Sequence, residues 1–96
     1  MIDLEPKYLE FVKKTVSSHL KDYRLYMFGS RVKGTAKPYS DIDLAIDSKE
    51  LTSNIKSALE FDFENSLLPY KVDIIDLNNI SSEFKAVIEN NLVRVV

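Results

Sequence analysis

Three segments of the chain carry apolar residues at the spacing of an amphipathic helix. They cover about residues 5–20, a stretch that begins near residue 51, and a short stretch that ends near Ile88. Pro6 is compatible with the first, because proline is tolerated in the opening turn of a helix. The candidate caps of the second and third are Ser48 or Thr52, and Asn79 or Ser81. The pattern therefore predicts three helices.

Four further segments have the character of β-strands. Residues 41–47 alternate strictly, with Ile42, Leu44 and Ile46 on one face and polar or small residues on the other. The remaining strands are expected at residues 23–28, 70–77 and 92–96. The alternating segment is therefore expected to be a strand that is polar on one face.

Strands and helices that alternate along a chain are typical of an α/β fold. The link between the first two strands is short, so they can be antiparallel, while later strands are separated by helices. We therefore expect an α/β fold with a mixed β-sheet and flanking helices. Two glycines, three prolines and no internal repeat give no sign of a linker, and we expect residues 1–96 to form a single domain.

Composition narrows the possible functions. A chain of 96 residues has room for one core, and a net charge of -2 argues against a surface that grips nucleic acid throughout, so no stable nucleic-acid binding is expected. It has no cysteine, which excludes thiolate chemistry and disulfides and suits the cytoplasm. No apolar run is long enough to span a membrane, and the N-terminus does not resemble a signal peptide. We expect a cytoplasmic protein with no membrane partner.

Asp41 and Asp43 lie two residues apart on the second strand, so both carboxylates project from the same face. Carboxylates without His or Cys suit Mg²⁺ or Mn²⁺, and two ions about 3.5–4 Å apart can be bridged by such a pair. Taken alone, an Asp-x-Asp strand is more often a solvated sheet edge. Together with Gly29, Ser30 and the later Asp73, it favours a metal site.

Gly29 and Ser30 follow the first strand, where a helix can begin with free backbone N–H groups and a hydroxyl facing an anion. Residues 24–40 include four basic residues and no acidic one. A basic loop is often only solvated, but here it follows a candidate phosphate cradle. Arg31 and Lys33 are therefore candidate phosphate contacts.

These motifs, taken in order, resemble a known superfamily. The chain is similar to the nucleotidyltransferases that include polymerase beta, kanamycin nucleotidyltransferase and the CCA-adding enzymes. The similarity lies in the order of its motifs: Gly29-Ser30, ten further residues, an Asp-x-Asp strand, and a later hydrophobic strand with Asp73. The short chain further resembles the minimal nucleotidyltransferases, the MNT proteins encoded beside HEPN-domain partners. The resemblance covers about residues 25–79.

The resemblance implies a polymerase-beta-like fold, ATP as substrate and two Mg²⁺ ions, with Mn²⁺ as a substitute. It also implies transfer of AMP with release of pyrophosphate. For the MNT subgroup it implies a protein adenylyltransferase, an antitoxin that adds AMP to a tyrosine of its HEPN toxin.

Carried over by position, the resemblance implies that Gly29 and Ser30 hold the β and γ phosphates, and that Asp41 and Asp43 ligate both metals. Asp73 would be the third carboxylate, either as a ligand of the catalytic metal or as the acceptor of the proton of the attacking hydroxyl.

Asp73 is preferred to Asp76 as the third carboxylate. It follows Val72 early in its strand, as the family pattern requires, whereas Asp76 projects from the opposite face.

Two other functions compete with that of a protein adenylyltransferase. The first is a binding module, a stoichiometric antitoxin that neutralises its partner by contact and keeps the nucleotide site as a relic. The second is a transferase for a small-molecule hydroxyl, which is disfavoured because 96 residues leave no second domain to enclose that substrate. Phe61 and Leu68 fit no clean apolar stripe and are candidates for a surface that docks a protein.

Overall fold

The computed structural model describes residues 2–96 and contains four strands and four α-helices in this range. They alternate as the sequence predicts, including a short helix that begins at Ser30 after the first strand, and a 3₁₀ helix lies near the end. In chain order they are α1 (Pro6–Ser17), β1 (Arg24–Phe28), α2 (Ser30–Lys33), β2 (Ile42–Asp47), α3 (Ser53–Glu64), β3 (Val72–Asp76), α4 (Ser82–Ile88), the 3₁₀ helix Glu89–Asn91, and β4 (Val93–Arg94).

The four strands form one mixed sheet in the order β3-β2-β1-β4. Strand β1 runs antiparallel to both β2 and β4, whereas β2 and β3, which are joined through α3, run parallel. The mixed sheet with flanking helices is confirmed. Short connections favour antiparallel neighbours and a helical crossover permits a parallel pair, so the order of elements in the sequence largely decides this topology.

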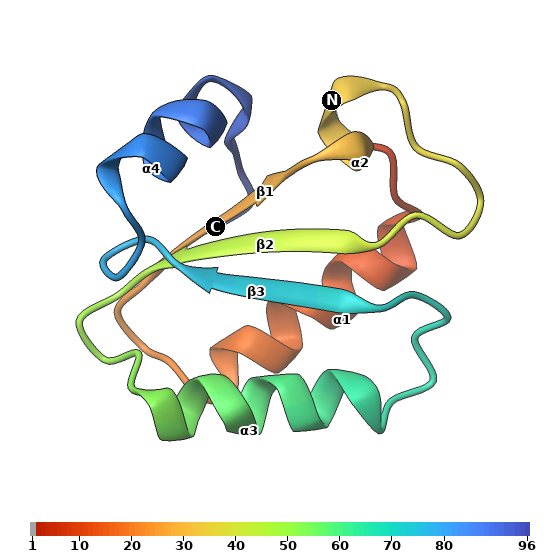
Figure 1. Ribbon diagram of the computed structural model, residues 1–96. Coiled ribbons are helices and arrows are strands. Elements are labelled where there is room, and N and C mark those ends of the chain that lie inside the picture. Colours follow the sequence, from red (N-terminus) through yellow and green to blue (C-terminus); the bar gives the residue numbers. More distant parts are fainter. Residues whose placement is uncertain (1) are drawn as a thin grey trace.

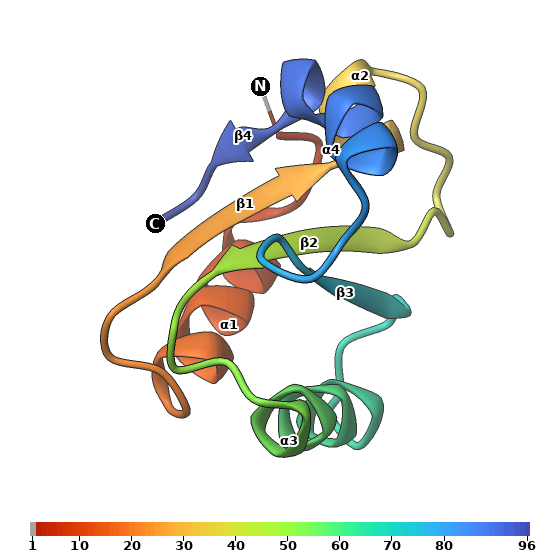
Figure 2. The same ribbon diagram turned by 60° about the vertical axis from the view of Figure 1, so that its left-hand side comes forward.

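The core lies between one face of the sheet and two helices. Figure 1 shows α1 and α3 on one side of the sheet and α4 on the other. Alternation along the strands directs apolar side chains to the α1 and α3 side, where full burial of a Leu or Ile side chain stabilises the fold by about 1.5–3 kcal/mol. The core includes Val12, Val16, Leu25, Met27, Ile42, Leu44, Ile46, Leu59, Phe63 and Ile74. The opposite face is mixed, and α4 lies on that side of the sheet (Figure 2). Beside Asp43 and Asp73 it carries apolar and aromatic residues, namely Tyr26, Phe28, Ala45 and Ile75, and Ala45 is fully buried.

Several predicted boundaries shift, for local reasons. Helix α1 ends at Ser17, earlier than predicted, yet Leu20 still enters the core from the loop that follows. Thr52 caps α3 by accepting from the Ile55 N–H at 3.2 Å, and Ser81 caps α4. Ser48, the other candidate cap for α3, instead donates to the Asp22 carbonyl at 2.7 Å.

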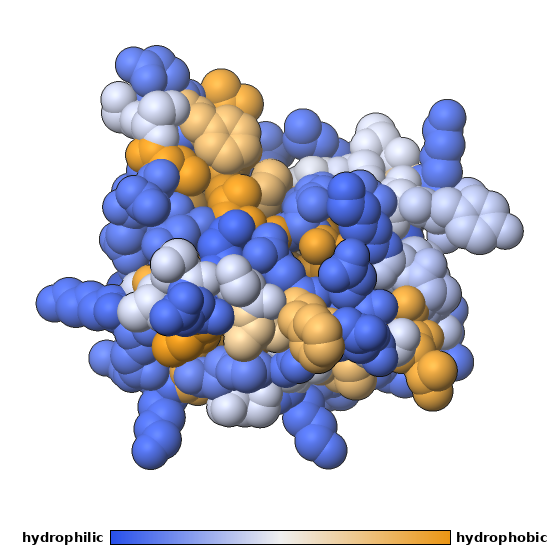
Figure 3. Space-filling model, turned by 60° about the horizontal axis from the view of Figure 1, so that its bottom comes forward, coloured by the Kyte–Doolittle hydropathy of each residue, from blue (hydrophilic) through white to orange (hydrophobic). Residues whose placement is uncertain are grey.

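The surface is mixed. Figure 3 shows apolar side chains as separate patches among hydrophilic ones. Phe61 is 64% exposed, as the docking hypothesis requires, whereas Leu68 packs against the core and the neighbouring Leu67 is fully exposed. Within residues 2–96, no helix is both long enough and apolar enough to cross a membrane.

Candidate functional site

The candidate site lies where β1 ends, on the face of the sheet away from α1 and α3. Strand β1 stops at Phe28, and Gly29 adopts φ +82° and ψ -156°, a conformation that is essentially restricted to glycine. Ser30 then begins α2. A Cβ atom on Gly29 would collide with Oδ2 of Asp43 and lie 3.1 Å from its Cγ. The predicted phosphate turn and the predicted metal ligand are therefore in direct contact.

The three predicted carboxylates share one neighbourhood. Asp43 on β2 pairs in register with Asp73 on β3, and Asp41 immediately precedes β2. Burial raises the pKa of Asp43 above its ordinary value, and the negative charges of Asp73 and Asp41 raise it further. The strand spacing thus brings together the carboxylates that the sequence singled out.

The carboxylates are near one another without forming a closed cage. Among residues 2–96, no three His, Cys, Asp or Glu side chains converge into a formed metal site. Lys71 lies 3.8 Å from the Asp73 carboxylate in an exposed pair, which weakens the local negative charge only slightly. Hard oxygen donors that repel one another on an open face nevertheless suit a divalent cation such as Mg²⁺, so the residues fit the metal that the resemblance implies.

Asp76 is occupied elsewhere. It pairs in register with Ile46, a core residue, and its carboxylate accepts from the backbone N–H of Asn78 at 2.9 Å. The side chain thus stabilises the turn after β3. The geometry favours Asp73 as the third carboxylate, as the sequence analysis did.

The two candidate basic contacts differ. Lys33 is exposed on α2, where a phosphate can reach it. Arg31 is only 5% exposed, and its guanidinium donates to the carbonyl oxygens of Ser40 and Asp3. The structure thus engages Arg31 with the protein itself. A four-residue helix is too short for a hydrophobic period, so no pattern in the sequence indicates this burial.

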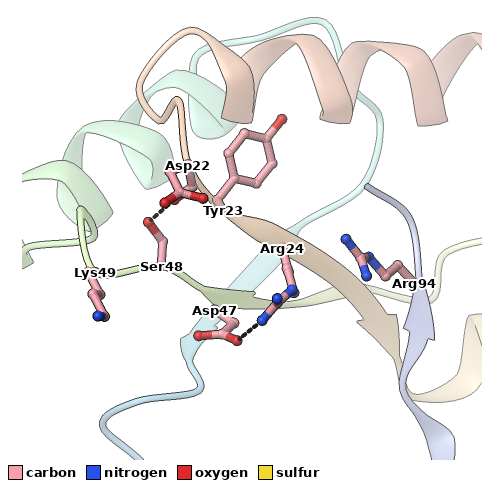
Figure 4. Close-up of a pocket in the computed structure, with 7 residues that line it drawn as sticks. All are labelled: Asp22, Tyr23, Arg24, Asp47, Ser48, Lys49 and Arg94. Carbon is pink, nitrogen blue, oxygen red and sulfur yellow. Dashed lines mark hydrogen bonds and ion pairs between the residues drawn. The ribbon is translucent and has the colours of Figure 1, made fainter.

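A polar pocket of about 400 Å³ lies at the opposite end of the sheet. Figure 4 shows Arg24 paired with Asp47, and Arg94 facing the same space from β4. None of the predicted site residues lines this pocket. The candidate site lies instead beside α2, at the other end of β1.

The sequence of the whole chain can be placed in a family. Residues 7–95 match the family model of the nucleotidyltransferase domain. The chain belongs to the nucleotidyltransferase family. It is 41% identical over 88 residues to the probable protein adenylyltransferase MntA of Haemophilus influenzae, covering 91% of this chain and 77% of that protein. The family assignment made from the motifs is confirmed.

Solved structures show the same nucleotidyltransferase fold. A chain from a toxin–antitoxin complex with AMP-PNP superposes with a TM-score of 0.78 at 23% identity, covering 92% of this chain and 72% of that one. A chain from the complex of a tri-AMPylated Shewanella oneidensis HEPN toxin with its MNT antitoxin gives 0.73 at 20% identity, covering 97% and 72%. At these identities the likeness concerns the fold.

Replacing Gly29 with Ala tests the backbone conformation of the phosphate turn. We expect a loss of stability of about 2 kcal/mol or more, because this conformation is strained for any side chain. The new methyl group also displaces the flexible end of Asp43, at a smaller cost. Gly34→Ala is the matched control. Gly34 also has a positive φ, of 78°, but nothing lies within 4 Å of its Cβ position, so a loss of about 1 kcal/mol is expected. Urea unfolding measures both losses, and equal losses would contradict the greater strain expected at Gly29.

Proposed function

We propose that this nucleotidyltransferase transfers AMP from ATP to a tyrosine hydroxyl of a HEPN-type toxin, with Mg²⁺, and thereby acts as an antitoxin. The observation that carries the proposal is the contact between Gly29 and Asp43, which sets the phosphate turn directly against the carboxylates. The similarity of this chain to proteins named as adenylyltransferases supports AMP as the transferred group. The toxin–antitoxin complexes with the same fold support a HEPN partner.

Each residue has a role in the proposed reaction. The turn at Gly29 and Ser30 binds the β and γ phosphates, and Lys33 adds a positive charge. Asp41, Asp43 and Asp73 would hold the metal ions, which when bound neutralise the triphosphate and polarise the α-phosphate. Asp73 accepts the proton of the attacking hydroxyl.

The atoms balance in a single displacement. The tyrosine oxygen forms a bond to the α-phosphorus as the bond from that phosphorus to the bridging oxygen breaks, and pyrophosphate leaves with the electron pair. The acceptor must approach opposite pyrophosphate, at about 3–3.5 Å from the phosphorus. In our proposal, a docked protein supplies this orientation. We further propose that the reaction takes place in the cytoplasm, where ATP and the partner are both present.

Mass spectrometry tests the proposal. The purified chain is incubated with Mg²⁺, ATP and a candidate HEPN-domain partner, and separately with free tyrosine and an aminoglycoside. A gain of about 329 Da per AMP is expected on a tyrosine of the partner alone, as in-line adenylyl transfer requires. The Asp41→Asn variant is the inactive control.

Two outcomes would contradict the proposal. A partner that is bound and neutralised with unchanged mass would identify a stoichiometric antitoxin. Efficient modification of a small alcohol with an untouched partner would identify a small-molecule transferase.

A further inference from the structure

We infer that Arg31 is a positioning residue, which holds the segments that carry Asp41 and Asp73 in register with the phosphate turn. The inference rests on the proposed function for its catalytic consequence, and on the contacts of the guanidinium for its structural basis. It assigns to Arg31 a different role from the phosphate contact that the sequence suggested.

The Arg31 guanidinium reaches the residue before Asp41. Its Nε and Nη2 atoms both donate to the Ser40 carbonyl oxygen, at 3.2 and 2.9 Å. The turn that ends at Ser40 is closed locally, since Lys37 N–H donates to the Ser40 hydroxyl at 2.8 Å. Two hydrogen bonds to a single carbonyl oxygen therefore fix the end of this turn. They also fix the start of the segment that carries Asp41.

The same side chain reaches the segment that leads into β3, the strand that carries Asp73. Its Cζ lies 4.2 Å from the centre of the Tyr70 ring, and Tyr70 is three residues before Asp73. Tyr70 is held in turn by Tyr8 of α1, edge to face, with ring centres 5.6 Å apart. The guanidinium thus lies between the Tyr70 ring and the Ser40 carbonyl, and Tyr70 in turn packs on α1.

A third contact ties the assembly to the start of the described chain. Arg31 Nη1 donates to the Asp3 carbonyl at 2.8 Å, and the Asp3 N–H donates back to the Arg31 carbonyl at 2.7 Å. No ion pair joins Arg31 to a carboxylate within residues 2–96. Its buried charge is therefore satisfied by backbone oxygens and an aromatic face, an arrangement that orders backbone segments.

This arrangement answers a need of the site. Three like-charged carboxylates on neighbouring segments repel one another until a cation binds, so something other than their own contacts must hold them in place. Arg31 directly follows Ser30, and its side chain contacts Ser40, beside Asp41, and Tyr70, in the segment that leads into the strand of Asp73. One side chain links all three functional segments.

The test replaces Arg31 with Lys, which keeps the charge but cannot grip one carbonyl with two nitrogens or stack a planar group on Tyr70. We expect kcat for AMP transfer to fall about tenfold or more and the Mg²⁺ concentration at half-maximal rate to rise about fivefold, because small misplacements of reacting groups are costly. KM for ATP at saturating Mg²⁺ should change less than about threefold. Arg24→Lys, the same change at an exposed position, should leave all three values unchanged.

The metal-free protein supplies a readout that does not depend on activity. In Arg31→Lys, amide hydrogen exchange at Ser40 and Ile42 should accelerate about tenfold, while Ala45 in the middle of β2 should be unchanged. Tyr70→Leu should act in the same direction as Arg31→Lys, and Tyr70→Phe, which keeps the ring, should behave as the unmodified protein. If Arg31→Lys does not fold, this pair decides the question.

Three results would overturn the inference. The first is a weakened affinity of Arg31→Lys for ATP with unchanged kcat and Mg²⁺ dependence, which would make Arg31 a phosphate ligand. The second is a lowered Tm of this variant with unchanged kinetics and hydrogen exchange. The third is hydrogen exchange at Ser40 and Ile42 that responds neither to Arg31→Lys nor to Tyr70→Leu. Should the unmodified protein transfer no AMP, the proposed function fails, while the exchange experiment still tests the positioning role.

Discussion

Replacing Asp43 with Asn is expected to abolish AMP transfer and, at neutral pH, to raise the Tm of the protein. The amide is a poor metal ligand in place of a carboxylate, and loss of several kcal/mol of charge stabilisation corresponds to a fall in kcat of about 10³-fold. The same substitution removes a charge that burial and two neighbouring carboxylates disfavour in the folded state. Activity and stability should therefore move in opposite directions.

The sign of the pH dependence follows from the raised pKa of Asp43. Below the pKa of an unfolded aspartate, the carboxyl is protonated in both states and costs nothing. As the pH rises through the higher folded-state pKa, the native protein must ionise Asp43 against burial and against Asp73 and Asp41, so stability is lost. The Tm advantage of Asp43→Asn should accordingly be largest near pH 7 and shrink toward pH 3.

Calorimetry across this pH range, without added metal, measures the advantage, and Asp47→Asn is the matched control. Asp47 lies on the same face of β2 and pairs with the exposed Arg24 and with Asn78, so its replacement should leave transfer intact and should not raise the Tm. An Asp43→Asn protein that retained a tenth of the activity, or that melted below the unmodified protein at pH 7, would refute the assignment.

Removing divalent metal is expected to weaken ATP binding about 100-fold. Without a cation, the carboxylates of Asp41, Asp43 and Asp73 repel the triphosphate, and a bound cation reverses the local charge. By linkage, ATP should strengthen the binding of Mg²⁺ by the same factor. Isothermal titration in Mg²⁺ and in EDTA measures the effect.

The Asp43→Asn variant again supplies the control, because it should lose less affinity in EDTA than the unmodified protein does. Equal affinity of the unmodified protein with and without Mg²⁺ would exclude a site bridged by metal. Ca²⁺ should support binding but little transfer, since its longer and looser coordination does not enforce the octahedral geometry of Mg²⁺.

Much of the fold could be predicted from the sequence because buried residues recur at a regular spacing along each strand and helix. Ile42, Leu44 and Ile46 alternate since one face of β2 meets α1 and α3, and this alternation also predicted that Asp43 would share the other face with Asp41. Helix ends were less accessible. Leu20 continues the apolar spacing of α1, but it reaches the core from the following loop, and only the folded chain distinguishes the two cases.

The role of Arg31 lay beyond the reach of sequence patterns. An arginine beside a Gly-Ser turn has the positive charge that a phosphate requires. Nothing in the neighbouring sequence shows that its N–H groups already donate to other parts of the protein. Its partners are two backbone carbonyls, at Ser40 and Asp3, and backbone groups carry no signature in a sequence. Conversely, Gly29 could be singled out from sequence, but its reason, contact with Asp43, appears only in three dimensions.

The parallel pairing of β2 with β3 sets the geometry of the candidate site. Asp43 faces Asp73 only because Ile42 and Ile74, with their neighbours, lock both strands onto the core in this register. A slip of one residue would bring Val72 or Ile74 to the open face and turn Asp73 toward the core. The apolar residues that fix this register lie on the face opposite the carboxylates, so a change in the core can separate Asp43 from Asp73 without altering either residue.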